Sequence, residues 1–148
     1  TVTTDLMEDC GLPLAKLSPE TLASVAELFP PWNKPDHPLD LWIAIERHGF
    51  ETVFRNSLTA VINDPAVDSI IFHSYATPLI GQAFFDELAA LIRKHKKPAV
   101  LWVEGRKDFA QHLRGIAENA GLPAYREMNR CVTVLKGMKQ HYTKKPMT

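Results

Sequence analysis

The sequence contains little that would tie it to a membrane, to a secretory route or to nucleic acid. Its longest apolar runs have the length of strands and fall far short of the ~20 residues that a membrane-spanning helix needs. The first ten residues lack a basic segment followed by an apolar one, so no signal peptide is expected. Seventeen Lys and Arg residues balance seventeen Asp and Glu residues. This neutrality predicts neither nucleic acid nor an anionic membrane as a partner.

Cysteine is also scarce. Cys10 and Cys131 are the two cysteines among 148 residues, and they lie far apart in the sequence. Both fall in helical patterns, where a small apolar side chain is typical. A disulfide is the alternative, but for a protein of the cytoplasm we expect buried free thiols.

The short motifs that mark common cofactor and catalytic sites are missing. The sequence has no GxGxxG dinucleotide fingerprint, no GxxxxGK phosphate loop, no GxSxG nucleophile turn and no Cys and His residues at metal-ligand spacing. These absences exclude the usual sequence signals for a nucleotide cofactor, a serine hydrolase or a metal site. No metal ligand is therefore predicted.

Two apolar runs separated by a helical pattern are the clearest positive feature. Residues 99–106, AVLWVEGR, form an apolar run that ends in a Glu-Gly-Arg turn, and residues 67–72, VDSIIF, precede it by about thirty residues. Continuous apolar runs joined in this way are typical of parallel strands with a crossover helix, because both faces of each strand are buried.

The remaining periodicities extend this pattern over the whole chain. They predict helices over 2–10, 18–29, 51–62, 79–94, 107–120 and 128–142, and strands over 12–17, 68–75, 99–103 and 122–125. Ser18 and Pro19 are expected to begin the second helix as N-cap and first helical residue. Alternation of this kind favours an α/β fold, a flavodoxin-like doubly wound parallel sheet in three α/β/α layers.

A proline-rich segment interrupts the alternation. Residues 30–38 contain four prolines, which rule out a helix or a central strand. Trp32 lies within the segment and Trp42 follows it, and both are expected to be buried. Asp40 follows His37 and could cap a helix, bond to the loop backbone or touch a partner. In a later helix, Phe109 is expected in the buried stripe with Leu113.

Polar residues follow the two central strands where each one ends. Ligands of open parallel sheets bind beyond the carboxyl ends of the strands, so His73, Tyr75, Glu104 and Arg106 are the candidate cofactor-binding residues. A histidine beside a carboxylate could transfer a proton or accept a phosphoryl group. The alternative is a hydrogen-bonded histidine that merely caps the strand end.

Short motifs along nearly the whole chain occur in an order that resembles one known family. Each motif alone is weak, and their order and spacing carry the resemblance. The residues concerned are Gly11-Leu12, Ser18-Pro19-Glu20-Thr21, Phe29-Pro30-Pro31, His37-Pro38-Leu39-Asp40-Leu41, Asp64-Pro65-Ala66-Val67-Asp68, Lys97-Pro98 and Gly121-Leu122-Pro123-Ala124-Tyr125. This order is similar to that of the NDP-forming acyl-CoA synthetases, the succinyl-CoA-synthetase-like ligases. One departure is His37, which stands where the family has Asn.

The resemblance implies that residues 1–148 are a single flavodoxin-like CoA-ligase domain and a fragment of a longer multidomain chain. The family has a strand and a Gly-rich loop before the opening helix, and this sequence begins after both. The resemblance therefore implies a sheet that lacks its first strand.

Enzymes of this family join a carboxylic acid to CoA with a nucleoside triphosphate, by way of an acyl phosphate and a phosphohistidine. The resemblance implies partners in the CoA-binding, phosphohistidine and ATP-grasp domains, with a homodimer as a further possibility. It places CoA and ATP or ADP with Mg in those domains. It assigns no catalytic residue to this chain, whose role would be structural and interdomain.

Two other functions stay open at this point. The same domain occurs in synthetase-like protein acyltransferases, where it would be a non-catalytic module for ligand sensing or interaction. A free-standing enzyme that uses His73 and Glu104 is the third hypothesis.

Overall fold

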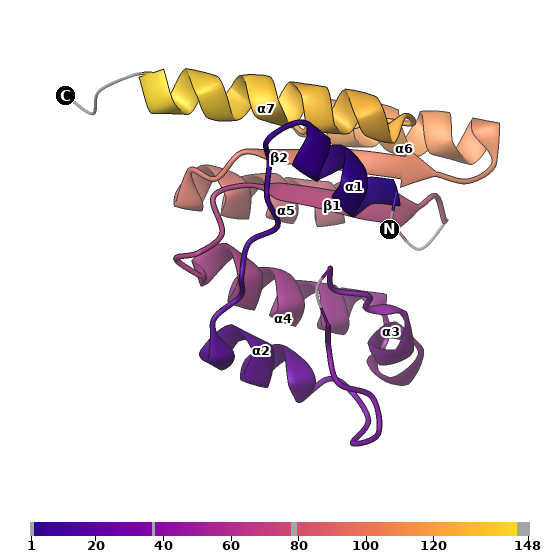
Figure 1. Cartoon of the computed structure of the whole chain (residues 1–148). Coiled ribbons are helices and arrows are strands. Elements are labelled where there is room, and N and C mark those ends of the chain that lie inside the picture. Colours follow the sequence, from indigo (N-terminus) through magenta and orange to yellow (C-terminus); the bar gives the residue numbers. More distant parts are fainter. Residues whose placement is uncertain (1, 37, 78–79, 145–148) are drawn as a thin grey trace. The chain divides into compact units, whose positions relative to one another are not determined.

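The computed structural model describes residues 2–36, 38–77 and 80–144 (Figure 1). The chain divides into two compact units, which we treat separately. The sheet unit comprises Thr1–Pro13 and Ser69–Thr148, and the helical unit comprises Leu14–Asp68.

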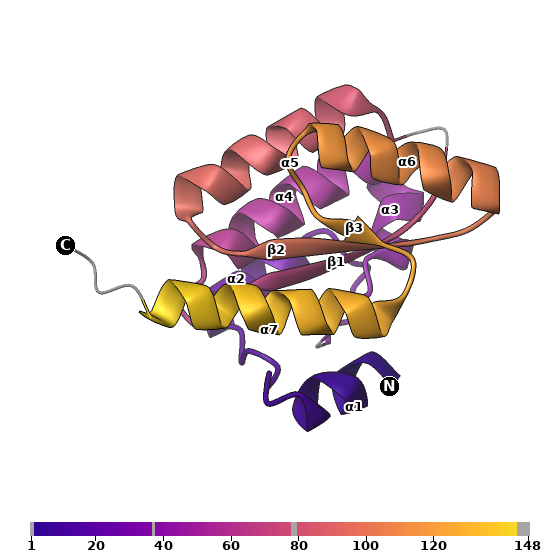
Figure 2. The ribbon, with the colours of Figure 1, turned by 90° about the horizontal axis from the view of Figure 1, so that it is seen from above.

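The sheet unit is built on a parallel sheet, as the sequence predicts. Strands β1 (Ile70–Tyr75), β2 (Ala99–Glu104) and β3 (Ala124–Tyr125) lie in the order β1-β2-β3, and both pairings are parallel. The helices of this unit are α1 (Val2–Asp9), α5 (Gln82–His95), α6 (Lys107–Asn119) and α7 (Met128–Lys144). Figure 2 shows α5 and α6 on one side of the strands and α7 with α1 on the other. The predicted α/β class, with layers on both faces of a parallel sheet, is confirmed.

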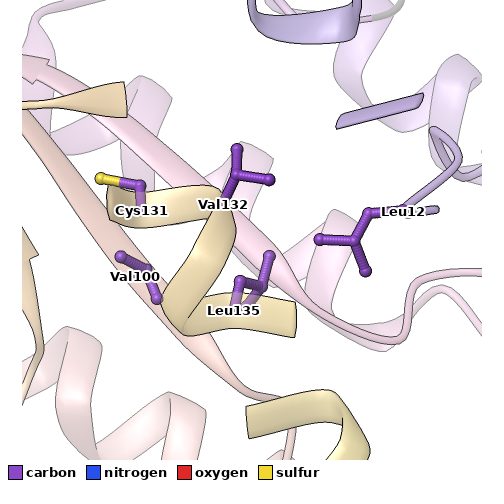
Figure 3. Packing of buried hydrophobic residues seen from close by; sticks show 5 residues of the cluster. All are labelled: Leu12, Val100, Cys131, Val132 and Leu135. Atoms are coloured by element: carbon purple, nitrogen blue, oxygen red, sulfur yellow. The ribbon is translucent and has the colours of Figure 1, made fainter. Parts of the chain in front are cut away.

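Strand β2 is the centre of this unit. It lies between β1 and β3, and its residues Ala99, Val100, Leu101 and Val103 are buried. Val100 packs with Leu12 and with the α7 residues Cys131, Val132 and Leu135 in one apolar cluster (Figure 3). Burial of an aliphatic side chain of this size contributes about 1.5–3 kcal/mol, so this cluster holds α7 on the sheet.

Both cysteines are free thiols, as predicted. Cys131 is fully buried, and its Sγ–H donates to the Leu101 carbonyl at 3.4 Å. Burial disfavours the thiolate and raises the pKa of Cys131 to about 11. Cys131 is therefore part of the core packing, whereas Cys10 is only half-buried.

The helical unit contains α2 (Pro19–Ala26), α3 (Trp42–His48) and α4 (Phe50–Asn63). Ser18 caps α2 as predicted, because its side chain accepts a hydrogen bond from the Thr21 amide and Pro19 follows at the first helical position. One buried apolar cluster of this unit consists of Val25, Phe29, Ala44 and Val53.

The predicted strand over residues 12–17 is wrong, because the structure has no strand there. A strand requires a neighbour that supplies ladder hydrogen bonds. The Leu12 amide donates instead to the Met7 carbonyl at 2.9 Å, in the turn where Gly11 (φ +69°) ends α1. The segment then runs unpaired from the sheet unit into the helical unit.

The sequence pattern does not predict helix α3. A helix of 7 residues is too short to be stable by propensity alone, and packing decides whether it forms. In α3 the packing comes from Ala44, which is buried, and from the half-buried Leu41 and Ile45. Asp40 lies just before the helix, and its Oδ1 accepts a hydrogen bond from the Trp42 amide at 3.0 Å.

Three aromatic residues that the sequence placed in the core are exposed. Trp32 is 76% exposed and Trp42 is 61% exposed. Leu41, Ala44 and Ile45 pack in the core of the helical unit, whereas Trp42, next to Leu41, is not part of that cluster. Phe109 is 37% exposed, and the Arg106 guanidinium lies 4.5 Å from the centre of its ring.

The other predicted elements are present with shifted ends. Strand β1 begins at Ile70 rather than at residue 68, and α5 begins at Gln82 rather than at residue 79. Residue 79, and with it His37 of the proline segment, lies outside the described residues. No helix in the described ranges is long and apolar enough to cross a bilayer.

Asp64 is a buried carboxylate that organises the helical unit. Its Oδ2 accepts a hydrogen bond from the Ser18 amide at 2.7 Å, and its Oδ1 accepts one from the Ala66 amide at 2.9 Å. These amide donors favour the ionised carboxylate and lower the pKa of Asp64 from 3.8 to about 2. The carboxylate thereby joins the start of α2 to the end of α4.

We predict that Asp64→Asn removes a pH-dependent part of the stability. The native pKa lies below the ordinary value, so the carboxylate stabilises the fold above about pH 4, and this contribution is lost as the pH falls towards 2. Urea unfolding at several pH values should show a lower midpoint for Asp64→Asn at pH 7 and a smaller further loss between pH 4 and pH 2. Glu46→Gln, at an exposed site of the same unit, should follow the wild type. Parallel curves for Asp64→Asn and the wild type would contradict the assignment.

Candidate functional site

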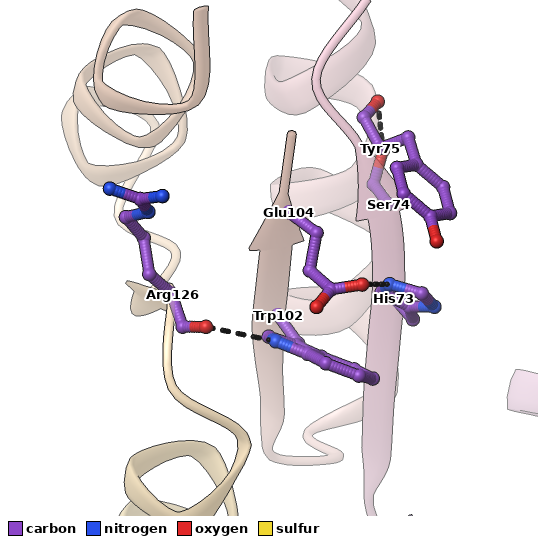
Figure 4. A network of polar contacts seen from close by, with 6 residues as sticks. All are labelled: His73, Ser74, Tyr75, Trp102, Glu104 and Arg126. Atoms are coloured by element: carbon purple, nitrogen blue, oxygen red, sulfur yellow. Dashed lines mark hydrogen bonds and ion pairs between the residues drawn. The ribbon is translucent and has the colours of Figure 1, made fainter. Parts of the chain in front are cut away.

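The register of β1 and β2 decides which predicted site residues meet. His73 pairs with Trp102, and Tyr75 pairs with Glu104. Alternate residues of a strand point to opposite faces, so all four side chains lie on the same face of the sheet. Figure 4 shows them together at the carboxyl ends of the two strands. We call these four residues the strand-end cluster.

The polar centre of the cluster is the pair His73 and Glu104. The imidazole Nε2 lies 3.1 Å from the Glu104 Oε2, and each side chain is 37% exposed. An ion pair at this exposure, which exists only when the imidazole is protonated, contributes at most about 1 kcal/mol. The pair can therefore hold or pass a proton, but it adds little to stability.

Aromatic rings fix the position of the imidazole. The His73 ring stacks on Trp102 with a centroid distance of 4.0 Å, and Tyr75 lies on it at 5.3 Å in a tilted arrangement. The indole is held in turn, because Trp102 Nε1–H donates to the Arg126 carbonyl at 3.0 Å (Figure 4). Tyr75 is 60% exposed, so the outer side of the cluster is open to solvent.

Of the four predicted site residues, His73, Tyr75 and Glu104 lie together, whereas Arg106 lies apart from them. Arg106 forms a bidentate pair with Asp108, in which Nε and Nη2 each donate at 2.8 Å. Its guanidinium also lies over Phe109. Arg106 therefore contacts the first turn of α6 instead of the His73–Glu104 pair.

Sequence reasoning overlooked Trp102 as a member of the cluster. The signal was available, because Trp102 stands two residues before Glu104 on one strand and must share its face. The chemistry of the cluster is limited to proton transfer or phosphoryl acceptance by an imidazole with a carboxylate partner. Within the described residues, no three His, Cys, Asp or Glu side chains come together in a way that could hold a metal ion.

Comparison with known proteins finds sequence similarity to part of a CoA ligase. Its curated relative, the ADP-forming acetate–CoA ligase II of Archaeoglobus fulgidus, is 32% identical over 135 residues, which is 91% of this chain. This chain is therefore similar to part of an ADP-forming acyl-CoA ligase. The resemblance found in the motif order is thus confirmed. No protein-family model matches the sequence.

The match covers 20% of the Archaeoglobus ligase, so the chain spans about a fifth of the length of that relative. It corresponds to one part of a larger ligase.

Solved structures share the fold. PH0766 from Pyrococcus horikoshii OT3 has a TM-score of 0.77 at 17% identity, over 96% of this chain and 33% of that one. A second match is the dinucleotide forming acetyl-coenzyme A synthetase 1 of Candidatus Korarchaeum cryptofilum, with a TM-score of 0.69 at 18% identity. That match spans 95% of this chain and 30% of the synthetase, which has been solved in an apo form and in complex with phosphate and ADP.

The turn after β2 brings the carboxyl ends of β1 and β2 close together. Gly105 has φ +121°, and a Cβ at this residue would lie 3.3 Å from both the Cβ and the amide nitrogen of Ala76. The Ala76 amide also donates to the Glu104 carbonyl at 2.7 Å, which keeps the two strand ends together.

We predict that Gly105→Ala lowers the free energy of unfolding by about 1–3 kcal/mol, because the backbone conformation and the contact with Ala76 both oppose a side chain. Gly137→Ala is the matched control. Gly137 is a helical residue with nothing within 4 Å of an added Cβ, so this change should be neutral or stabilising by up to about 1 kcal/mol. Equal urea midpoints for the two variants would contradict the prediction.

Proposed function

We propose that this chain is a domain of an NDP-forming acyl-CoA synthetase, which joins a carboxylic acid to CoA with a nucleoside triphosphate in the cytoplasm. The observation that carries the proposal is the match of 135 residues to one part of an ADP-forming acetate–CoA ligase. In the proposed reaction a phosphoryl group passes through a phosphohistidine to the acid, and CoA then displaces phosphate from the acyl phosphate. The phosphohistidine belongs to another domain.

The role proposed for this domain is structural. Its partners would be the CoA-binding, phosphohistidine and ATP-grasp domains of the same enzyme, and the nucleotide with its Mg would bind to those domains. The residues of this chain support that division of labour, because the polar centre of the strand-end cluster is a single half-exposed imidazole–carboxylate pair that is open to solvent. The cluster would then serve as a surface of the domain and not as the reaction centre.

We predict that the isolated chain shows no nucleotide hydrolysis that depends on both an acid and CoA, whereas the full-length protein that carries it turns over. Phosphate release with acetate, CoA and ATP measures both. Robust turnover by the isolated chain would refute the proposal and favour a free-standing enzyme. Binding of acetyl-CoA without turnover by the full-length protein would instead favour the ligand-sensing module of a protein acyltransferase.

His73→Ala in the full-length protein tests the role of the cluster. A general acid or base contributes typically 10²–10⁴-fold to the rate, so a structural His73 should leave kcat within about threefold of the wild type. His112→Ala, at an exposed position of α6, is the matched control. A loss of about a hundredfold or more for His73→Ala alone would show that His73 takes part in the chemistry.

A further inference from the structure

A second polar feature of the sheet unit lies away from the strand-end pair. A hollow of about 410 Å³ lies between α6 and the connection from β3 to α7. Its volume falls within the range of sites for small ligands. The residues that line it are Lys107, Gln111, Arg114, Gly115, Glu118 and Arg126.

The lining is strongly cationic although the whole chain is neutral. Lys107, Arg114 and Arg126 face one acidic residue, Glu118, whose Oε1 lies 3.6 Å from the Arg114 Nη2. The α6 residues recur at three- and four-residue spacing, so they form one stripe along the helix. Arg126 belongs to the connection from β3 to α7, so positive charge from two separate segments lines a single hollow.

Arg114 and the backbone of Arg126 hold the frame of the hollow, which leaves Lys107 and the Arg126 side chain as its outward cations. Arg114 Nε donates to the Ala124 carbonyl at 3.1 Å, which ties α6 to β3. The Arg126 carbonyl accepts from the Trp102 indole, and Figure 4 shows the Arg126 side chain extending away from Trp102. The position of the Arg126 backbone is therefore set while its guanidinium stays exposed.

We propose that this hollow binds the phosphate group of a small anionic molecule, a phosphate ester or a diphosphate. The planar fork of the Arg126 guanidinium matches phosphate oxygens, the Lys107 ammonium supplies a further charge, and the Gln111 amide can donate a hydrogen bond. An acidic segment of a protein would present carboxylates along a chain, whereas here the cations converge on one concave space. This proposal does not depend on the function proposed above for the domain as a whole.

Gly115 provides a way to close the hollow without disturbing the fold. It lies in the middle of α6 and lines the hollow, and nothing stands within 4 Å of an added Cβ. Leu is also a better helix former than Gly. Gly115→Leu should therefore fill the space and leave the melting temperature unchanged or higher.

The test is an NMR titration of the 148-residue chain with inorganic pyrophosphate at constant ionic strength. We expect saturable shifts at the amides of residues 107–118 and 126. Lys107→Gln or Arg126→Gln should each weaken binding roughly threefold to tenfold, since each removes one charge-assisted hydrogen bond. Gly115→Leu should abolish the shifts, and Lys107→Arg should retain them.

Lys94→Gln with Lys136→Gln is the control for general loss of charge, because both residues are exposed and neither lines the hollow. It should leave binding unchanged, and an equal loss in this control would overturn the proposal. Titrations with ADP and with CoA then compare the dissociation constants of these two phosphate compounds with that of pyrophosphate. The proposal fails if adenosine binds as tightly as ADP, if no saturable shift occurs, or if oligoglutamate binds where pyrophosphate does not.

Discussion

The parallel ladder between β1 and β2 is the interaction on which the sheet unit depends. Its six residue pairs run from Ile70 with Ala99 to Tyr75 with Glu104. Backbone hydrogen bonds continue past both ends, from the Ile70 amide to the Pro98 carbonyl and from the Ala76 amide to the Glu104 carbonyl. A slip of one residue would turn every side chain of β1 to the opposite face, so the register determines both the core and the strand-end cluster.

One face of β2 shows how the same register separates packing from chemistry. Val100 lies under α7 in the apolar cluster, Trp102 lies at its margin, and Glu104 reaches His73 at the end of the strand. Val100 is fully buried against α7, so an apolar side chain is required there. His73 and Glu104 are each 37% exposed, and a half-exposed ion pair carries little cost.

The relationship to ADP-forming acyl-CoA ligases gives this arrangement its context. The chain matches about a fifth of the Archaeoglobus enzyme. In the function proposed above, the domain keeps its fold while it presents surfaces to other domains. Its surface includes Trp32, Trp42 and Tyr75, which are 76%, 61% and 60% exposed, and the cationic hollow beside α6.

Local patterns in the sequence determined the parallel strands, the crossover helices and the Ser18 cap, because each depends on residues close together in the chain. They also placed His73, Tyr75 and Glu104 at one edge of the sheet, since parallel strands bring their carboxyl ends together. Only the tertiary structure decided that residues 12–17 stay unpaired, that α3 forms and that Arg106 turns to Asp108. The tertiary structure also decided which amides bind the Asp64 carboxylate and that Arg126 lines the same hollow as the α6 residues. These outcomes rest on contacts between distant segments, and no local periodicity records which neighbour a strand, a short helix or a charged side chain will find.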